Sequence, residues 1–228
     1  YPDNPIRFAV IVRAALRLLA GRPPIDILHA HDWQAALAPL LLHHPSTAWP
    51  AQRRPRTVLT IHNLAYQGVF PTWVMDAAAL PRELFTVHHF EFFGQVSFLK
   101  AGLVAADAVT TVSPTYAQEI LTPAHGCGLE GVLAQRAGDL FGILNGLDVA
   151  VWNPETDAHL PRPYRARSVL SGKRAARAAV ARELGLAPGM RPLAGMVSRL
   201  LEQKGVDVLA AAIADIVALG FDLVVLGR

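Results

Sequence analysis

The sequence has little cysteine, no long hydrophobic run and no extended block of one charge sign. Its single cysteine, Cys127, excludes an internal disulfide and a zinc site built from cysteines, and it fits a reducing compartment such as the cytoplasm. No apolar run reaches membrane length, and no signal peptide is visible. Lysine and arginine are mostly scattered and the formal net charge is only +3, so neither a membrane nor a nucleic acid is expected as a partner.

What is present is a regular alternation of apolar runs and helical patterns. The chain has 228 residues, of which 52% are hydrophobic, so it can bury a sizeable core. Strand-like runs lie at 26–31, 57–62, 108–113, 140–144, 193–198 and 221–226. Helical patterns lie at 6–20, 33–43, 95–106, 114–122, 129–136, 172–184 and 205–219. Because the strands are continuously apolar, the sequence predicts an α/β protein with doubly wound parallel sheets covered on both faces.

The periodicity breaks between residues 148 and 171, which contain two proline-rich stretches, and we place a domain junction there. The chain begins at Tyr1 rather than at methionine and stops directly after a strand-like run. We therefore expect a fragment of a longer protein.

Two cations stand five positions apart where one strand passes into the next helix. Arg199 follows the run 193–198, and Lys204 precedes the helical pattern 205–219. The first turn of a helix offers free N–H groups and a favourable dipole, so these cations could grip a phosphate or diphosphate. The competing interpretation is that both are solvated cations of a loop.

Polar residues also follow the first two strands, where ligands bind in such sheets. Asp32 precedes a helical pattern, so a helix N-cap role competes with ligand contact without excluding it. His29 and His31 share one strand face, and with Asp32 they raise the alternative of a metal-dependent hydrolase, although the usual hydrolase spacing is not met. A buried, hydrogen-bonded histidine is the commoner explanation. His62 and Asn63 follow the second strand, and they either form part of a ligand site or belong to an ordinary polar turn.

Three further residues are weak candidates by themselves. Lys100 lies in a helical pattern, where a lysine usually extends to solvent. Glu130 could act on a substrate or serve as a first-turn carboxylate of a helix. Asn145 belongs to an ordinary turn dipeptide with Gly146.

Taken together and in order, these motifs resemble the bacterial glycogen synthases, the ADP-glucose-dependent family shared with plant starch synthases. The stretches that carry the resemblance are 29–33 (HAHDW), 60–68 (TIHNLAYQG), 94–102 (GQVSFLKAG), 111–119 (TVSPTYAQE), 129–133 (LEGVL), 143–148 (ILNGLD), 197–200 (VSRL) and 203–205 (QKG). The resemblance implies a GT-B architecture with two Rossmann-like domains, both incomplete here. Residues 1–150 would belong to the acceptor-side domain, 151–170 to a linker and 171–228 to the nucleotide-sugar domain.

The resemblance also implies a reaction, the retaining transfer of glucose from ADP-glucose to the non-reducing 4-hydroxyl of an α-1,4-glucan such as glycogen, in the cytoplasm and without metal or cofactor. Family matching places Asp32 and His62 at the reacting centre and assigns the leaving diphosphate to Arg199 and Lys204. The substrate-binding residues that it implies are His62, Asn63, Asn145, Arg199 and Lys204.

The sequence departs from the family in three ways. The N-terminal Lys-Thr-Gly-Gly-Leu loop and the later glutamate usually regarded as catalytic are absent. Arg228 stands where the family has a small residue, as a variant or as an artefact of truncation. We therefore expect the isolated chain to lack transferase activity. A paralogue that binds glucan or nucleotide without chemistry and the metal-dependent hydrolase remain the alternatives.

Overall fold

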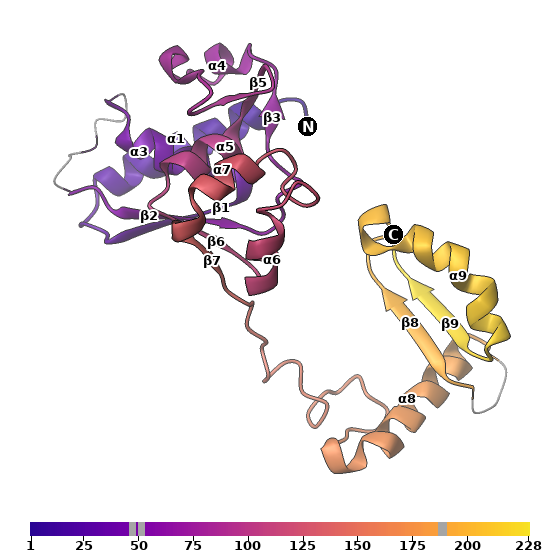
Figure 1. Ribbon diagram of the computed structural model, residues 1–228. Coiled ribbons are helices and arrows are strands. Elements are labelled where there is room, and N and C mark those ends of the chain that lie inside the picture. The colour runs from indigo at the N-terminus through magenta and orange to yellow at the C-terminus, as the bar shows by residue number, and fades with distance from the viewer. Residues whose placement is uncertain (46–48, 50–52, 187–190) are drawn as a thin grey trace. The chain divides into compact units, whose positions relative to one another are not determined.

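The computed structural model describes residues 1–45, 49, 53–186 and 191–228. The chain divides into two compact units, Tyr1–Gly146 and Leu147–Arg228 (Figure 1). Among the helices of the described residues, none combines the length and the apolar character needed to cross a membrane.

The first unit is built on a parallel sheet with strand order β1-β2-β6-β7. Its strands are β1 (Ile27–His31), β2 (Arg56–Ile61), β6 (Ala108–Thr111) and β7 (Leu140–Gly142). A separate antiparallel sheet has the order β3-β5-β4, with β3 (Val69–Phe70), β4 (Glu91–Phe92) and β5 (Gln95–Ser97). The helices are α1 (Asn4–Ala20), α2 (Asp32–Ala35), α3 (Leu37–His43), α4 (Val74–Ala77), α5 (Phe98–Ala105), α6 (Pro114–Glu119) and α7 (Glu130–Gln135), with 3-10 turns η3 (Arg82–Leu84) and η4 (Ala137–Asp139).

One face of the parallel sheet carries the core. Leu28 and Ala30 of β1 and Leu59 and Ile61 of β2 are buried on it and pack with apolar side chains of the surrounding helices. The opposite face is more polar, and β1 alternates between exposed and buried residues instead of being continuously buried. The sheet thus leaves a polar, partly exposed face beside the carboxyl ends of its strands.

The second unit holds two parallel strands and two long helices (Figure 1). Its elements are η5 (Ala166–Ser168), α8 (Val169–Glu183), β8 (Leu193–Val197), η6 (Glu202–Lys204), α9 (Val206–Ala218) and β9 (Asp222–Leu226). Arg177 of α8 forms a 2.7 Å ion pair with Asp222 at the start of β9. This contact fixes α8 to the amino end of the strand pair.

The six strands predicted from the sequence are all confirmed, whereas two predicted helices are corrected. The helical pattern 33–43 is divided at Ala36 into α2 and α3. A continuous helix would need a hydrogen bond from residue 39 to the carbonyl of Ala35, and Pro39 has no N–H to donate. The pattern 95–106 begins as strand β5, because residues 95–97 pair with β3 and β4, and the helix starts only after Ser97, which caps it.

Candidate functional site

Asp32 lies where β1 passes into α2, next to the end of β2. Its φ of 54° is in the left-handed region, which a non-glycine residue rarely adopts and which is concentrated at functional sites. Its Oδ1 accepts a 2.7 Å hydrogen bond from the backbone N–H of His62. The N-cap interpretation is therefore wrong: His31 precedes the helix, and the Asp32 carboxylate joins two strand ends because β1 and β2 run parallel and in register.

The imidazole rings of the strand ends form a cluster on the polar face of the sheet. Nδ1 of His31 lies 3.0 Å from Nε2 of His62, and the rings of His29 and His31 have centroids 4.2 Å apart. Nε2 of His29 lies 2.7 Å from the hydroxyl of Thr60, which contacts the hydroxyl of Thr110 at 2.6 Å. Partial desolvation of its ring, together with the neighbouring rings of His31 and His62, lowers the pKa of His29.

The metal-dependent hydrolase alternative receives no support from this geometry. Among the described residues, no group of three or more His, Cys, Asp or Glu side chains is arranged to hold a metal ion. His31 and His62 point their ring nitrogens at each other, and Asp32 is engaged with a backbone amide.

The loop after β2 is fixed by local hydrogen bonds. Asn63 Oδ1 accepts from the backbone N–H of Ala65 at 3.0 Å, which makes an Asx turn. Gly68 has a φ of +60°, and a Cβ there would lie 2.5 Å from the Trp33 ring, so only glycine lets the loop approach this ring. The loop and Trp33 border a hollow of about 580 Å³, which is also lined by Tyr66 and Cys127.

The predicted site residue Asn145 is exposed and follows β7, which belongs to the same parallel sheet as β2.

The second unit places its two predicted cations between β8 and α9, as the sequence predicts. Arg199 follows β8, and Lys204 ends the 3-10 turn η6 before Gly205, whose φ is +74°. Both side chains are exposed, and neither takes part in a salt bridge within the part of the chain that the structure describes. A hollow of about 370 Å³ at the ends of β8 and β9 is lined by Val197, Ser198, Arg199, Leu226, Gly227 and Arg228.

The hollow brings together Arg199 and Arg228, a pair that sequence reasoning missed. The signal was available, because Val197 and Leu226 are register partners in adjacent parallel strands, so residues that follow them share one edge.

Lys100 and Glu130 also differ from their sequence-based interpretations. Lys100 does not extend to solvent: it is buried, and its Nζ donates to the backbone carbonyl of Glu91. Burial lowers the pKa of the Lys100 amine, and the nearby Glu91 carboxylate acts in the opposite direction. Glu130 does begin α7, but its Oε2 is buried without a hydrogen-bond partner in the described residues and packs against Gly126.

Comparison with known proteins identifies the family of this chain. Residues 1–135 match the family model of the starch synthase catalytic domain. The chain belongs to this family. A glycogen synthase of Anaeromyxobacter dehalogenans (strain 2CP-C) is 53% identical over 232 residues, which are 100% of this chain and 48% of that protein. A protein named glycogen synthase 2 of Geobacter sulfurreducens is 48% identical and is covered to 47% of its length by the whole chain.

A solved structure supports the fold as well. The catalytic domain of starch synthase IV from Arabidopsis thaliana, bound to ADP and acarbose, matches with a TM-score of 0.86 and 36% identity over 99% of this chain and 47% of that chain. The expected fold class, α/β of the GT-B type with parallel sheets, is thereby confirmed. The chain spans about half the length of the curated relatives that it matches.

Proposed function

We propose that this chain is part of a glycogen synthase that transfers glucose from ADP-glucose to the non-reducing 4-hydroxyl of an α-1,4-glucan with retention of configuration. The observation that carries the proposal is the joint position of Asp32 and His62, which are hydrogen-bonded at the strand ends of a chain matched throughout by glycogen synthases. The ADP and acarbose of the Arabidopsis structure support an ADP-sugar donor and a glucan acceptor. A cytoplasmic enzyme that needs no metal is part of the proposal.

The reaction decides which groups the protein has to supply. Positive charge develops at the anomeric carbon and negative charge on the departing diphosphate, and preorganised charges and dipoles stabilise both. We assign the first centre to Asp32 and His62. Arg199 and Lys204, exposed beside the amino end of α9, are assigned to the diphosphate.

The remaining assignments concern substrate binding and the division of the chain into domains. Asn63 and Asn145 lie at the carboxyl end of the sheet in the first unit and are proposed to bind substrate. Residues 1–150 would form the acceptor side, 151–170 the linker and 171–228 the nucleotide-sugar side.

The test uses a chimera in which this chain replaces the matching half of the Anaeromyxobacter dehalogenans enzyme, with the unmodified enzyme as its control. We expect glucose incorporation into glycogen from ADP-glucose, weaker incorporation from UDP-glucose, and no loss of either with EDTA. The 228-residue chain alone should be inactive. A well-folded chimera that transfers glucose from neither donor would refute the proposal, and loss of activity with EDTA would refute the metal-free mechanism.

A further inference from the structure

Two adjacent residues hold His62 at two different points. Asp32 Oδ1 accepts from its backbone N–H at 2.7 Å, and His31 Nδ1 contacts its ring Nε2 at 3.0 Å. The first contact fixes the backbone of His62, and the second fixes the rotation of its ring. Two residues at the carboxyl end of β1, His31 and Asp32, thus hold His62, which follows β2.

The ring contact determines which nitrogen of His62 is left for a ligand. A hydrogen bond between two imidazole nitrogens needs one proton between them, carried by one ring and accepted by the other. Because Nε2 of His62 is occupied by this bond, Nδ1 is its remaining ring nitrogen. His62 is exposed, and Nδ1 is the ring nitrogen that remains for a substrate hydroxyl.

His31 is itself held by contacts that reach across the sheet. The ring of His29 lies against it, with an interplanar angle of 33°. His29 is bonded to the hydroxyl of Thr60 on β2, and Thr60 to that of Thr110 on β6. Partial desolvation lowers the pKa of this neighbouring ring. The orientation of His31 is therefore supported by three strands.

We propose that His31 is a positioning residue: through its hydrogen bond to Nε2 it sets the ring rotation and tautomer of His62, so that Nδ1 faces the sugar. The role of the sugar rests on the proposed function, whereas the effect on the ring of His62 does not. His31 was a candidate metal ligand in the hydrolase alternative, and the structure gives it this different task.

The tautomer is measured directly by NMR on the 228-residue chain labelled with ¹⁵N-histidine. We expect one dominant tautomer for the His62 ring, assigned by its loss in His62→Gln. His31→Leu should convert it to a solvent-like mixture, and His31→Asn, whose side-chain amide can occupy the Nδ1 position, should restore one tautomer. His88→Leu, which replaces an exposed histidine elsewhere, should leave the His62 signals unchanged. Backbone spectra show whether each variant remains folded.

The chimera provides the kinetic readout. We expect His31→Leu to lower kcat about tenfold, as for one lost hydrogen bond in the transition state, with little change in the KM for glucan. His31→Asn should recover most of this loss. Unchanged His62 signals in His31→Leu would overturn the proposal, as would an unchanged kcat in an active chimera. A chimera that is inactive before any substitution would refute the proposed function instead. The NMR measurement of the His62 tautomer would then test the role of His31 by itself.

Discussion

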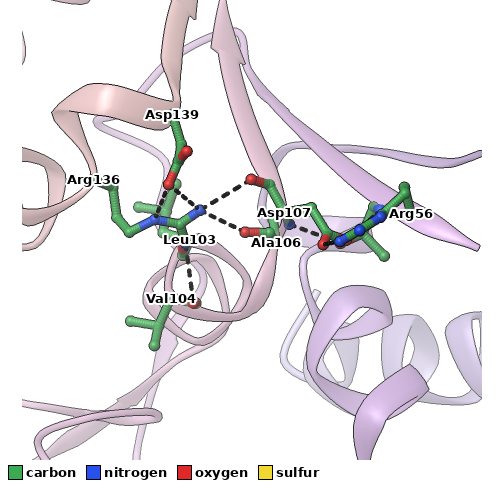
Figure 2. A network of polar contacts seen from close by, with 8 residues as sticks. Arg56, Leu103, Val104, Ala106, Asp107, Arg136 and Asp139 are labelled. Carbon is green, nitrogen blue, oxygen red and sulfur yellow. Dashed lines mark hydrogen bonds and ion pairs between the residues drawn. The ribbon is translucent and has the colours of Figure 1, made fainter.

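Arg136 closes the carboxyl end of α5, and its removal gives the sharpest stability prediction (Figure 2). Its Nη1 donates to the carbonyls of Leu103 and Val104 at 2.7 and 3.0 Å, and its Nη2 to those of Ala106 and Asp107 at 2.6 and 3.3 Å. The last carbonyls of a helix have no partner within the helix. A single guanidinium satisfies four of these backbone groups in and just after the last turn of α5.

The expected loss for Arg136→Met follows from these bonds. Methionine keeps much of the apolar stem but no donor, and each hydrogen bond to a charged group contributes about 1.5–3 kcal/mol. Water will replace part of this, since the Arg136 side chain is 19% exposed. The pair with Asp139, whose side chain is 55% exposed, adds little. We expect the free energy of unfolding of the first unit to fall by about 2–4 kcal/mol.

The assay is urea unfolding followed by tryptophan fluorescence in a Trp152→Phe background, which leaves tryptophan only in the first unit. Arg17→Met, which replaces an exposed arginine of α1, is the matched control and should cost less than about 0.5 kcal/mol. Arg136→Lys should fall between the two, because an ammonium cannot reproduce the fork of donors. A loss below about 1 kcal/mol for Arg136→Met would refute the capping argument.

Three further predictions concern packing, catalysis and pH. Gly102→Ala should cost about 1–3 kcal/mol in the same assay, because the new Cβ would lie 2.4 Å from the carbonyl oxygen of Ala36. Arg199→Ala or Lys204→Ala in the chimera should lower kcat about 100-fold to 1000-fold, and a change below about tenfold would remove the charge-stabilising role. The folded-state pKa of His29 lies below its ordinary value of 6.5, so the unfolded chain takes up this proton first as pH falls from neutral. The free energy of unfolding should therefore decline as the pH falls through 6.5. Urea midpoints measured across this pH range should decline less in His29→Gln.

The parallel sheet was predictable because its signals are local. Its strands fall in short runs that are rich in apolar residues, and polar residues directly follow the first two of these runs. Once β1 and β2 are known to be parallel neighbours, Asp32 and His62 must lie at one edge of the sheet. The resemblance added roles for these residues, which the sequence pattern alone left open.

Other features depend on contacts between distant residues and leave no periodic trace. Strands β3, β4 and β5 have only two or three residues each, too few to show alternation. Lys100 carries an ordinary helical lysine pattern, and its burial is decided by the carbonyl of Glu91. The contact between His31 and His62 likewise depends on two ring orientations that no sequence spacing specifies.

Strand β2 is bracketed by two aspartates whose surroundings differ. Asp107 accepts from the backbone N–H of Thr57 at its start, and Asp32 from that of His62 just past its end, both at 2.7 Å. Asp107 also accepts from the Thr57 hydroxyl and from Arg56. Burial works against its charge, but these hydrogen bonds outweigh burial and lower the pKa of Asp107. Asp32 enters no salt bridge of the described residues and has a left-handed backbone.

The same substitution at both aspartates therefore separates stability from chemistry. Asp107→Asn weakens a closed network and should lower the free energy of unfolding by about 1–3 kcal/mol, with kcat of the chimera unchanged. Asp32→Asn keeps an acceptor for the His62 N–H and tolerates the left-handed backbone, so it should cost less stability. Because it removes the negative charge proposed to face the anomeric carbon, it should lower kcat at least about tenfold. Equal effects of the two variants on kcat would show that the Asp32 carboxylate is a structural brace like that of Asp107.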